Sequence, residues 1–316
     1  MTVTLDDIKQ AHQRIQPYIH CTPILQSTQL NKLFTCELFF KADNMQKVGA
    51  FKARGACNAL FSMTQEVLAN GVITHSSGNH GAALAWAAAM RKASCTVVMP
   101  ENAPQAKKDA VLSYGATVVY CEPTMTAREG TVTRLIEQQG ARLVHPYDDD
   151  LIIAGQGTAT LETLAQLDKP ADVLMTPVGG GGLLGGSAIV VKQSPQAGIT
   201  RVIGAEPEAA NDAWLGFRSG ARLAEFVPNT IADGLRGTVG VRNFEIITQH
   251  VDDILLASEA RIVEAMKLIW TRLKIVVEPS AAVPLAAIMD QPEQFNGKRV
   301  AIILSGGNLD LDALPW

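Results

Sequence analysis

The pattern of apolar and polar positions along the chain predicts strands that alternate with helices. Leu5, Ile8, Ala11 and Ile15 recur at helical spacing and predict a helix near the start of the sequence. Further along, short apolar runs bounded by Gly, Pro or polar residues predict strands, and several of them precede a helical segment. These runs are residues 37–41, 71–74, 95–99, 117–121, 173–176, 201–205 and 299–304.

This alternation indicates the α/β class. Strands that alternate with helices of about ten residues or more favour parallel sheets covered by helices. The strand runs pause after residue 121 and resume near residue 172, so we expect two α/β domains with open parallel sheets. A site between the two domains follows from the preference of ligand pockets for domain interfaces.

Composition and charge limit the partners of the protein. The net charge of −4 and the absence of a basic run argue against nucleic acid as a partner. No segment reaches the roughly 18 apolar residues of a membrane helix, so we expect no membrane partner. The five cysteines contain no CxxC pair, and the N-terminal residues lack the apolar run of a secretory signal. We therefore expect reduced thiols and a cytoplasmic protein.

Four consecutive glycines, Gly179, Gly180, Gly181 and Gly182, follow an apolar strand and precede a helical segment. Without Cβ atoms, such a loop can bring successive backbone N–H groups against an anion, and the helix N-terminus adds positive potential. The pattern is neither a P-loop nor a dinucleotide-binding fingerprint. It predicts a phosphate-binding loop, and a turn that merely requires glycine is the alternative.

Lys52 lies between the apolar residues Phe51 and Ala53, where a helix is predicted to begin. A lysine at the start of a helix is ordinarily a solvated charge. Partial burial would instead lower its pKa and yield a nucleophilic amine. The local sequence leaves both interpretations open.

Seven motifs follow one another over nearly the whole chain. They are QKVGAFKARGA (46–56), SSGNHG (76–81), GGGGLLGG (179–186), GAEPEAAND (204–212), IADGL (231–235), VEPSAAV (277–283) and SGGN (305–308). In order and spacing they resemble the fold-type II pyridoxal-phosphate (PLP) enzymes, and within them the group of serine/threonine dehydratases and serine racemases. The resemblance implies a tryptophan synthase β-like fold and a homodimer. It also implies a large PLP-binding domain of residues 1–48 and 150–316, a small domain of residues 49–149 inserted in it, and an active site in the cleft between them.

The resemblance also implies which residues contact the cofactor. Lys52 carries PLP and later moves the substrate α-proton, while Phe51 packs beside the pyridine ring. Gly179–Gly182 hold the phosphate, Asn79 is similar to the residue that bonds the phenolic oxygen, and Ser305 resembles the hydroxyl that meets the pyridine nitrogen. A hydroxyl at that position leaves the ring largely neutral, whereas a carboxylate would strengthen its electron sink. A neutral ring suits prompt elimination of a β-substituent.

The resemblance assigns the substrate carboxylate to the loop of Ser76, Ser77, Asn79 and His80. Ser77 would lie on the opposite face of the substrate from Lys52, as a second acid or base and a route to racemisation. Without the other motifs, this segment is equally an ordinary loop rich in turn-forming residues.

Two arginines are candidates for substrate binding. Arg128 is similar to an arginine near the substrate carboxylate in racemase-like members of the family. Arg236 follows the IADGL motif and is a candidate partner for a second substrate carboxylate, which would favour 3-hydroxyaspartate. An ordinary exposed arginine is the alternative for Arg236.

A divalent cation is the second expected cofactor. Glu206, Ala210 and Asp212 fall where racemase-like members hold a cation through two carboxylates and one backbone carbonyl. Such hard oxygen ligands suit Mg²⁺, Mn²⁺ or Ca²⁺. Carboxylates that follow a strand also occur as solvated or helix-capping groups, which is the alternative.

The resemblance therefore implies an ammonia-lyase that converts a small β-hydroxy amino acid, of the L-threonine or L-serine type, to a 2-keto acid and ammonia. The alternatives are a 3-hydroxyaspartate ammonia-lyase that gives oxaloacetate, and a serine racemase. Tyr147, in His145-Pro-Tyr147, resembles the dehydratases more than the animal racemases. β-Replacement enzymes share the fold, but SSGNHG favours the dehydratases. A binding protein would not need a lysine, a phosphate loop and a pyridine partner together.

Overall fold

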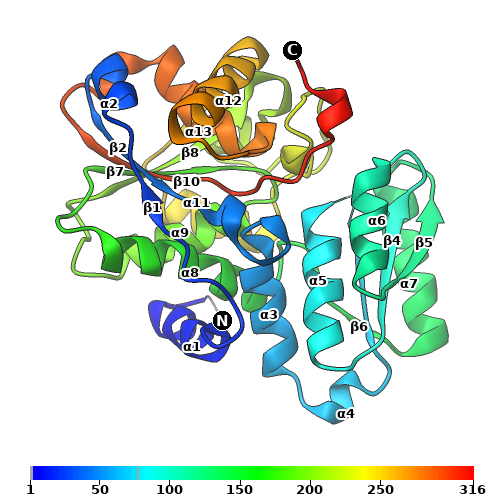
Figure 1. The fold of residues 1–316 in the computed structure, drawn as a ribbon. Coiled ribbons are helices and arrows are strands. Elements are labelled where there is room, and N and C mark those ends of the chain that lie inside the picture. Colours follow the sequence, from blue (N-terminus) through cyan, green and yellow to red (C-terminus); the bar gives the residue numbers. More distant parts are fainter. Residues whose placement is uncertain (1–2, 77) are drawn as a thin grey trace.

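The chain folds into two modules, each built around its own sheet (Figure 1). The computed structural model describes residues 3–76 and 78–316. The larger module has six strands in the order β1 (Ile24–Leu25), β2 (Glu37–Lys41), β10 (Arg299–Ile303), β7 (Val173–Pro177), β8 (Arg201–Pro207) and β9 (Asp253–Ala257). The smaller module has four, in the order β5 (Thr117–Cys121), β4 (Cys95–Pro100), β3 (Val72–His75) and β6 (Arg142–Leu143).

Strand direction agrees with the sequence-based expectation. β1 pairs antiparallel with β2, and the other neighbouring strands in both sheets pair in parallel. The α/β class with two open parallel-sheet domains is therefore confirmed. The residue limits predicted for the two domains stay a prediction.

Helices cover both faces of each sheet (Figure 1). In the larger module, α12 (Glu259–Leu273) and α13 (Pro279–Asp290) pack on one face, and α9 (Gly182–Lys192) and α11 (Val241–His250) pack on the other. In the smaller module, α5 (Asn79–Met90) and α6 (Gln105–Ser113) lie on one face and α7 (Met125–Gln139) on the other. The remaining α-helices are α1 (Leu5–Ile15), α2 (Thr28–Phe34), α3 (Lys52–Ser62), α4 (Gln65–Leu68), α8 (Asp150–Gln166) and α10 (Asp212–Ser219). Across residues 3–76 and 78–316, the structure contains no helix with the length and apolar character needed to span a bilayer.

The continuous apolar runs of the central strands follow from this layering. Successive side chains of a strand point to opposite faces of the sheet. Phe40 accordingly belongs to the core beneath α12 and α13, and the preceding Phe39 packs in the core beneath α9. A strand covered by helices on both faces needs apolar residues at every position rather than at alternate ones.

Helix α3 lies between the two modules and packs against α8 on one side and α5 on the other (Figure 1). Its contact with α8 is a close approach of two backbones. A Cβ atom built on Gly155 would lie 2.5 Å from the Cα of Gly55. No side chain fits at that crossing, so glycine is required where the two helices meet.

Arg54 fixes the first turn of α3 to the larger module. The residue is fully buried, and its guanidinium forms two-pronged hydrogen bonds with two carboxylates. Its Nε and Nη2 donate to Asp43 at 2.7 and 2.9 Å, and its Nη1 and Nη2 donate to Glu162 at 2.8 and 2.9 Å. Asp43 begins the 3₁₀ helix η1 (Asp43–Met45), and Glu162 lies on α8. Three segments are thus joined by one side chain.

Lys41 completes this buried ionic network. Its Nζ donates to Glu162 Oε2 at 2.7 Å and to two further oxygen atoms, so all three of its N–H groups have acceptors. Two cations then balance two carboxylates, and each charge is hydrogen-bonded, which is the condition for tolerating charges in a protein interior. We call the side chains of Lys41, Asp43, Arg54 and Glu162 the Arg54 network.

Replacement of Arg54 by methionine should destabilise the protein strongly. The substitution leaves Asp43 and Glu162 buried without their main partner, and breaking a buried ion pair from one side costs about 3–5 kcal/mol. Denaturant unfolding of Arg54→Met measures this loss. Lys9→Met is the control, because Lys9 forms an exposed pair with Asp6 and such pairs contribute about 0.5 kcal/mol. Equal stability of the two variants would contradict the role assigned to Arg54.

Candidate active site

Lys52 is the first residue of α3 and lies beside the segment that follows β10. The backbone N–H of Phe51 donates to the Ser305 carbonyl at 2.9 Å, and Ala50 forms an isolated bridge with Gly306. Two distant parts of the chain are thereby joined at the carboxyl end of a central strand. This is the edge of an α/β sheet at which ligands usually bind.

The amine of Lys52 is in an environment that favours its neutral form. Its Nζ donates to the Pro146 carbonyl at 2.9 Å and lies 5.1 Å from the centre of the Phe51 ring. Burial lowers the pKa of Lys52 to about 8, and the opposing effect of the Glu278 carboxylate limits this decrease. A substantial fraction of the amine is thus unprotonated near neutral pH, as a nucleophile or general base requires. Of the two interpretations of Lys52, these contacts support the functional one.

The four glycines form the turn between β7 and α9. The backbone N–H groups of Gly179–Gly182 donate to no acceptor within residues 3–76 and 78–316. Gly181 has a φ of +91° and precedes the first residue of α9. A Cβ atom at Gly180 would lie 2.2 Å from the ring of Tyr147. The loop therefore excludes side chains and offers free N–H groups at a helix N-terminus, which is the chemistry of a phosphate site.

Ser305 and Asn79 supply two polar groups near Lys52. Ser305 is 3% exposed, and its hydroxyl makes no hydrogen bond with any residue that the structure describes. The side-chain amide of Asn79 is held in one orientation. Its Nδ2 donates to Glu278 Oε1 at 2.9 Å, and its Oδ1 accepts from Asn308 Nδ2 at 2.9 Å.

Glu278 is a site residue to which the sequence analysis gave no role. It is 2% exposed and close enough to Lys52 to affect its pKa. Burial raises the pKa of Glu278 to about 7, while Lys107 lowers it and Asp233 raises it. In the sequence, a glutamate before Pro279 is typical of an ordinary helix N-terminus. The VEPSAAV motif was the only available signal.

The substrate loop predicted from the sequence lies at the start of α5. The hydroxyl of Ser76 accepts from the backbone N–H groups of Gly78 and Gly81 at 3.2 and 3.0 Å, so it shapes the loop. The Nε2 of His80 lies 3.3 Å from the Val144 carbonyl, and burial lowers the pKa of this imidazole well below its ordinary value. Ser77 lies outside the described residues.

These contacts leave backbone groups for a carboxylate. The N–H groups of Asn79 and His80 begin α5 and have no acceptor among the residues described. A neutral His80 that donates from Nε2 has no proton on Nδ1, so its imidazole offers the substrate no second N–H. The helix N-terminus itself is the better anion partner at this end of the site.

Arg128 lies in a cluster of aromatic rings beside the glycine loop. The ring of His145 makes edge contacts with Tyr147 and His75, with centroids 4.7 and 5.4 Å apart. Burial lowers the pKa of His75 to about 4, and His145 and Arg128 contribute to the decrease, so His75 is neutral. The Nε of Arg128 is buried and has no hydrogen-bond partner in the described parts of the chain. Within those parts, Arg128 is also a cation without a carboxylate in an ion pair.

Arg236 is placed differently. Its Nε and Nη2 both donate to the Thr230 carbonyl, at 3.1 and 2.7 Å, and the residue is exposed. This guanidinium already closes a turn of the backbone. The structure therefore favours the ordinary interpretation of Arg236 over substrate binding.

Glu206 and Asp212 are buried neighbours at the carboxyl end of β8. The Glu206 carboxylate accepts from the backbone N–H groups of Ala213 and Trp214 at 3.2 and 2.8 Å. Burial and the charge of Asp212 raise the pKa of Glu206 well above its ordinary value. Neither carboxylate has a basic partner within the described residues, which also contain no group of three His, Cys, Asp or Glu side chains suited to a metal. A cation here would need the Ala210 carbonyl as a further ligand.

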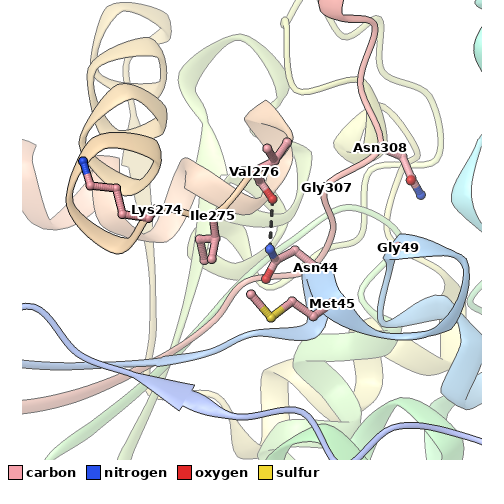
Figure 2. A pocket seen from close by; sticks show the side chains of 8 residues that line it. All are labelled: Asn44, Met45, Gly49, Lys274, Ile275, Val276, Gly307 and Asn308. Carbon is pink, nitrogen blue, oxygen red and sulfur yellow. Dashed lines mark hydrogen bonds between the residues drawn. The ribbon is translucent and has the colours of Figure 1, made fainter.

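A separate cavity of about 410 Å³ opens on the far side of Asn308 (Figure 2). One wall contains Asn44, whose side-chain Nδ2 donates to the Val276 carbonyl at 2.9 Å. Figure 2 shows Lys274 at one end of this cavity and Asn308 at the other. Lys52 does not line it, so this cavity is not the site described above.

The residues around Lys52 fit the PLP cofactor that the resemblance implies. The glycine loop has free N–H groups for a phosphate, and the buried Ser305 hydroxyl lacks a partner among the described residues. The partly buried Phe51 packs with Leu183 at the start of α9 and provides an apolar surface for a ring. Lys52, Gly179–Gly182 and Ser305 would hold the cofactor. When bound, PLP withdraws electrons from the α-carbon of the amine it carries.

The fold and the site define a PLP-dependent enzyme, and comparison with known proteins agrees. The chain belongs to the family described as pyridoxal-phosphate dependent enzyme, whose sequence model matches residues 15–306. It is 49% identical over 313 residues to β-hydroxyaspartate dehydratase of Paracoccus denitrificans, covering 99% of this chain and 98% of that protein.

Solved structures give the same result. The crystal structure of serine racemase from Dictyostelium discoideum is 49% identical, with a TM-score of 0.92 over 98% of this chain and 100% of that chain. The crystal structure of a threonine deaminase from the organism abbreviated T.th. is 43% identical, with a TM-score of 0.91 over 98% of this chain and 99% of that chain. The family resemblance inferred from the motifs is confirmed.

The reactivity of Lys52 should rise through an unusually low pH. Because burial lowers its pKa from 10.5 to about 8, the neutral amine forms over that lower range. Trinitrobenzenesulfonate labelling of cofactor-free protein, mapped by mass spectrometry to the Lys52 peptide, should have a midpoint near pH 8. In Glu278→Gln the midpoint should fall further, because the carboxylate that stabilises the ammonium is lost. A midpoint at the ordinary value would contradict the burial argument.

Proposed function

We propose that this protein is a PLP-dependent dehydratase, an ammonia-lyase that converts a small β-hydroxy amino acid of the L-threonine or L-serine type to a 2-keto acid and ammonium. The observation that carries the proposal is the Lys52 amine beside a hydroxyl, rather than a carboxylate, at Ser305. A hydroxyl leaves the pyridine nitrogen largely neutral, which favours prompt loss of a β-substituent. The similarity to a dehydratase and a deaminase supports the same chemistry.

Lys52 acts as the general base in the proposed reaction. Its neutral amine takes the α-proton, the Cβ–O bond of the substrate breaks, and the hydroxyl leaves as water with a proton. The enamine product leaves the site and tautomerises to an imine, which water hydrolyses to the keto acid and ammonium. One water leaves and one is added, so the net change is the loss of ammonia.

A second candidate is a 3-hydroxyaspartate ammonia-lyase that gives oxaloacetate. The observation in its favour is Arg128, whose buried Nε has no partner in the described chain and could bind a second carboxylate of the substrate. The similarity to a β-hydroxyaspartate dehydratase supports it as well. Serine racemisation is a third candidate, supported by the similarity to serine racemases. It depends on Ser77, whose role stays a prediction.

A keto-acid release assay distinguishes these candidates. The holoenzyme is tested with L-serine, L-threonine and the four 3-hydroxyaspartate stereoisomers, with a chiral readout of serine. We expect keto acid from at least one substrate and none from Lys52→Ala, which lacks the general base. Formation of cysteine from O-acetylserine and sulfide without keto-acid release would replace the dehydratase assignment by β-replacement.

The same assay with arginine variants tests the dicarboxylate substrate. Loss of a hydrogen-bonded charge costs about 1.5–3 kcal/mol, so Arg128→Met should lower kcat/KM for 3-hydroxyaspartate roughly 10- to 100-fold. The loss for threonine should be smaller. Arg236→Met is the matched comparison and should leave the preference unchanged, since its guanidinium binds Thr230. A shift in preference in Arg236→Met alone would restore the sequence-based hypothesis for Arg236.

We also propose a divalent cation, Mg²⁺, Mn²⁺ or Ca²⁺, at Glu206, Asp212 and the Ala210 carbonyl. Support comes from two neighbouring buried carboxylates without a basic partner among the described residues. Chelation by EDTA should lower the melting temperature, and Mg²⁺ should restore it, because the ion offsets the repulsion between the carboxylates. Glu206→Gln should abolish the response to chelator. An identical melting temperature with and without EDTA would argue that the two groups serve only as helix caps.

The remaining expectations concern partners and location. A small amino-acid substrate is consistent with the family of PLP-dependent enzymes. The homodimer and the cytoplasmic location stay predictions.

A further inference from the structure

Lys107 of the smaller module forms an ion pair with Asp233 of the larger module. Lys107 lies in the first turn of α6, and Asp233 begins the 3₁₀ helix η4 (Asp233–Leu235). Their side chains are 12% and 30% exposed. A lysine so far buried at the end of a flexible side chain is unusual for a surface pair. The contact therefore has a defined geometry.

The pair lies between the two loops of the site. A Cβ atom built on Gly78, in the loop that begins α5, would lie 3.3 Å from both Cδ and Nζ of Lys107. On the other side, a Cβ atom built on Gly179 would lie 3.1 Å from the Cα of Leu235, the last residue of η4. Lys107 and Asp233 thus join the substrate loop to the segment that packs on the glycine loop.

This ion pair differs from the others in what it connects. Among the described residues, it is the only ion pair between residues 65–143, which contain the four-stranded sheet, and the rest of the chain. Side-chain hydrogen bonds beside it are those of Asn79 with Glu278 and Asn308. Polar contacts between the modules therefore concentrate at the mouth of the site.

Local charges explain why Lys107 takes this position. Glu278 and Asp233 are two carboxylates close enough to raise the pKa of Glu278, and the positive charge of Lys107 acts on both. An ammonium near two carboxylates is attracted to each, and the low exposure of its side chain limits screening by solvent. Opening the cleft would separate Lys107 from both acids.

We propose that Lys107 and Asp233 form a latch that closes the smaller module over the site and fixes the segment Gly78–Gly81 in its substrate-binding position. Lys107 is a positioning residue, because it acts through this segment and not on the reacting atoms. The inference deepens the proposed function and rests on it only for the identity of the substrate. It assigns to the closed state a contact that the amino-acid substrate does not itself supply.

The latch predicts a specific kinetic pattern in the holoenzyme. Loss of the ion pair populates the open state, so Lys107→Met should raise KM about fivefold, the scale of a partly exposed pair, and change kcat little. Lys107→Arg keeps the charge and should restore most of the affinity. Lys108→Met is the matched control, because Lys108 lies on the same helix and donates to the Glu101 carbonyl, away from the cleft.

Hydrogen–deuterium exchange of the holoenzyme tests the latch without turnover. Peptides that cover α6 and residues 230–236 should exchange faster in Lys107→Met and Asp233→Asn than in the unmodified protein or in Lys108→Met. The double variant Lys107→Asp with Asp233→Lys restores an attractive pair and should recover slow exchange, whereas each single charge reversal should not.

Two outcomes would overturn the inference. One is unchanged exchange and KM in Lys107→Met. The other is a double charge reversal that exchanges as fast as the single reversals, which would mean that the two residues act independently. If no substrate released keto acid, the proposed function would fail, but the exchange measurement would still decide whether the latch exists.

Discussion

The position of the reactive lysine depends on the buried Arg54 network, whose arginine follows it by two residues in the same helical turn. Four charges in a protein interior are tolerated only when each is paired, so the network demands one arrangement of β2, η1, α3 and α8. Glycine contacts extend that arrangement. Gly155 of α8 meets Gly55 of α3, and Gly157 of α8 meets Gly186 of α9, where an added Cβ would lie 2.7 Å from the Gly157 nitrogen. Through α8, the lysine at the start of α3 and the glycine loop at the start of α9 are held at a fixed separation.

Much of the fold followed from the apolar pattern, because strands covered on both faces leave a strong signal. The predicted runs 37–41 and 117–121 coincide with β2 and β5, and the opening helix is α1, with Ile8, Ala11 and Ile15 buried. Other elements escaped detection. Helix α8 is apolar nearly all round and contains Gly155 and Gly157, so its sequence lacks the amphipathic period that identifies a helix. Strands β1 and β6 contain two residues each, too few for any pattern.

The site was predicted best where it depends on backbone and worst where it depends on side-chain pairing. Consecutive glycines before a helix indicate a phosphate loop by themselves, and the structure gives that loop free N–H groups. Glu278, Lys107 and Asp233 could not be found in this way, because they are ordinary charged residues far apart in the sequence. Arg128 and Arg236 were equally eligible as sequence, and only their contacts distinguish them. The Nε of one has no partner among the described residues, and that of the other is bound to a carbonyl.

The groups of the site are divided unequally between the modules. Lys52, the glycine loop and Ser305 all belong to elements joined to the larger sheet, whereas Ser76, His80 and Arg128 belong to the smaller one. An opening of the cleft would therefore carry away the substrate-binding groups and leave the cofactor-binding groups in place. Such an enzyme can exchange a small metabolite at every cycle while retaining its prosthetic group over many cycles.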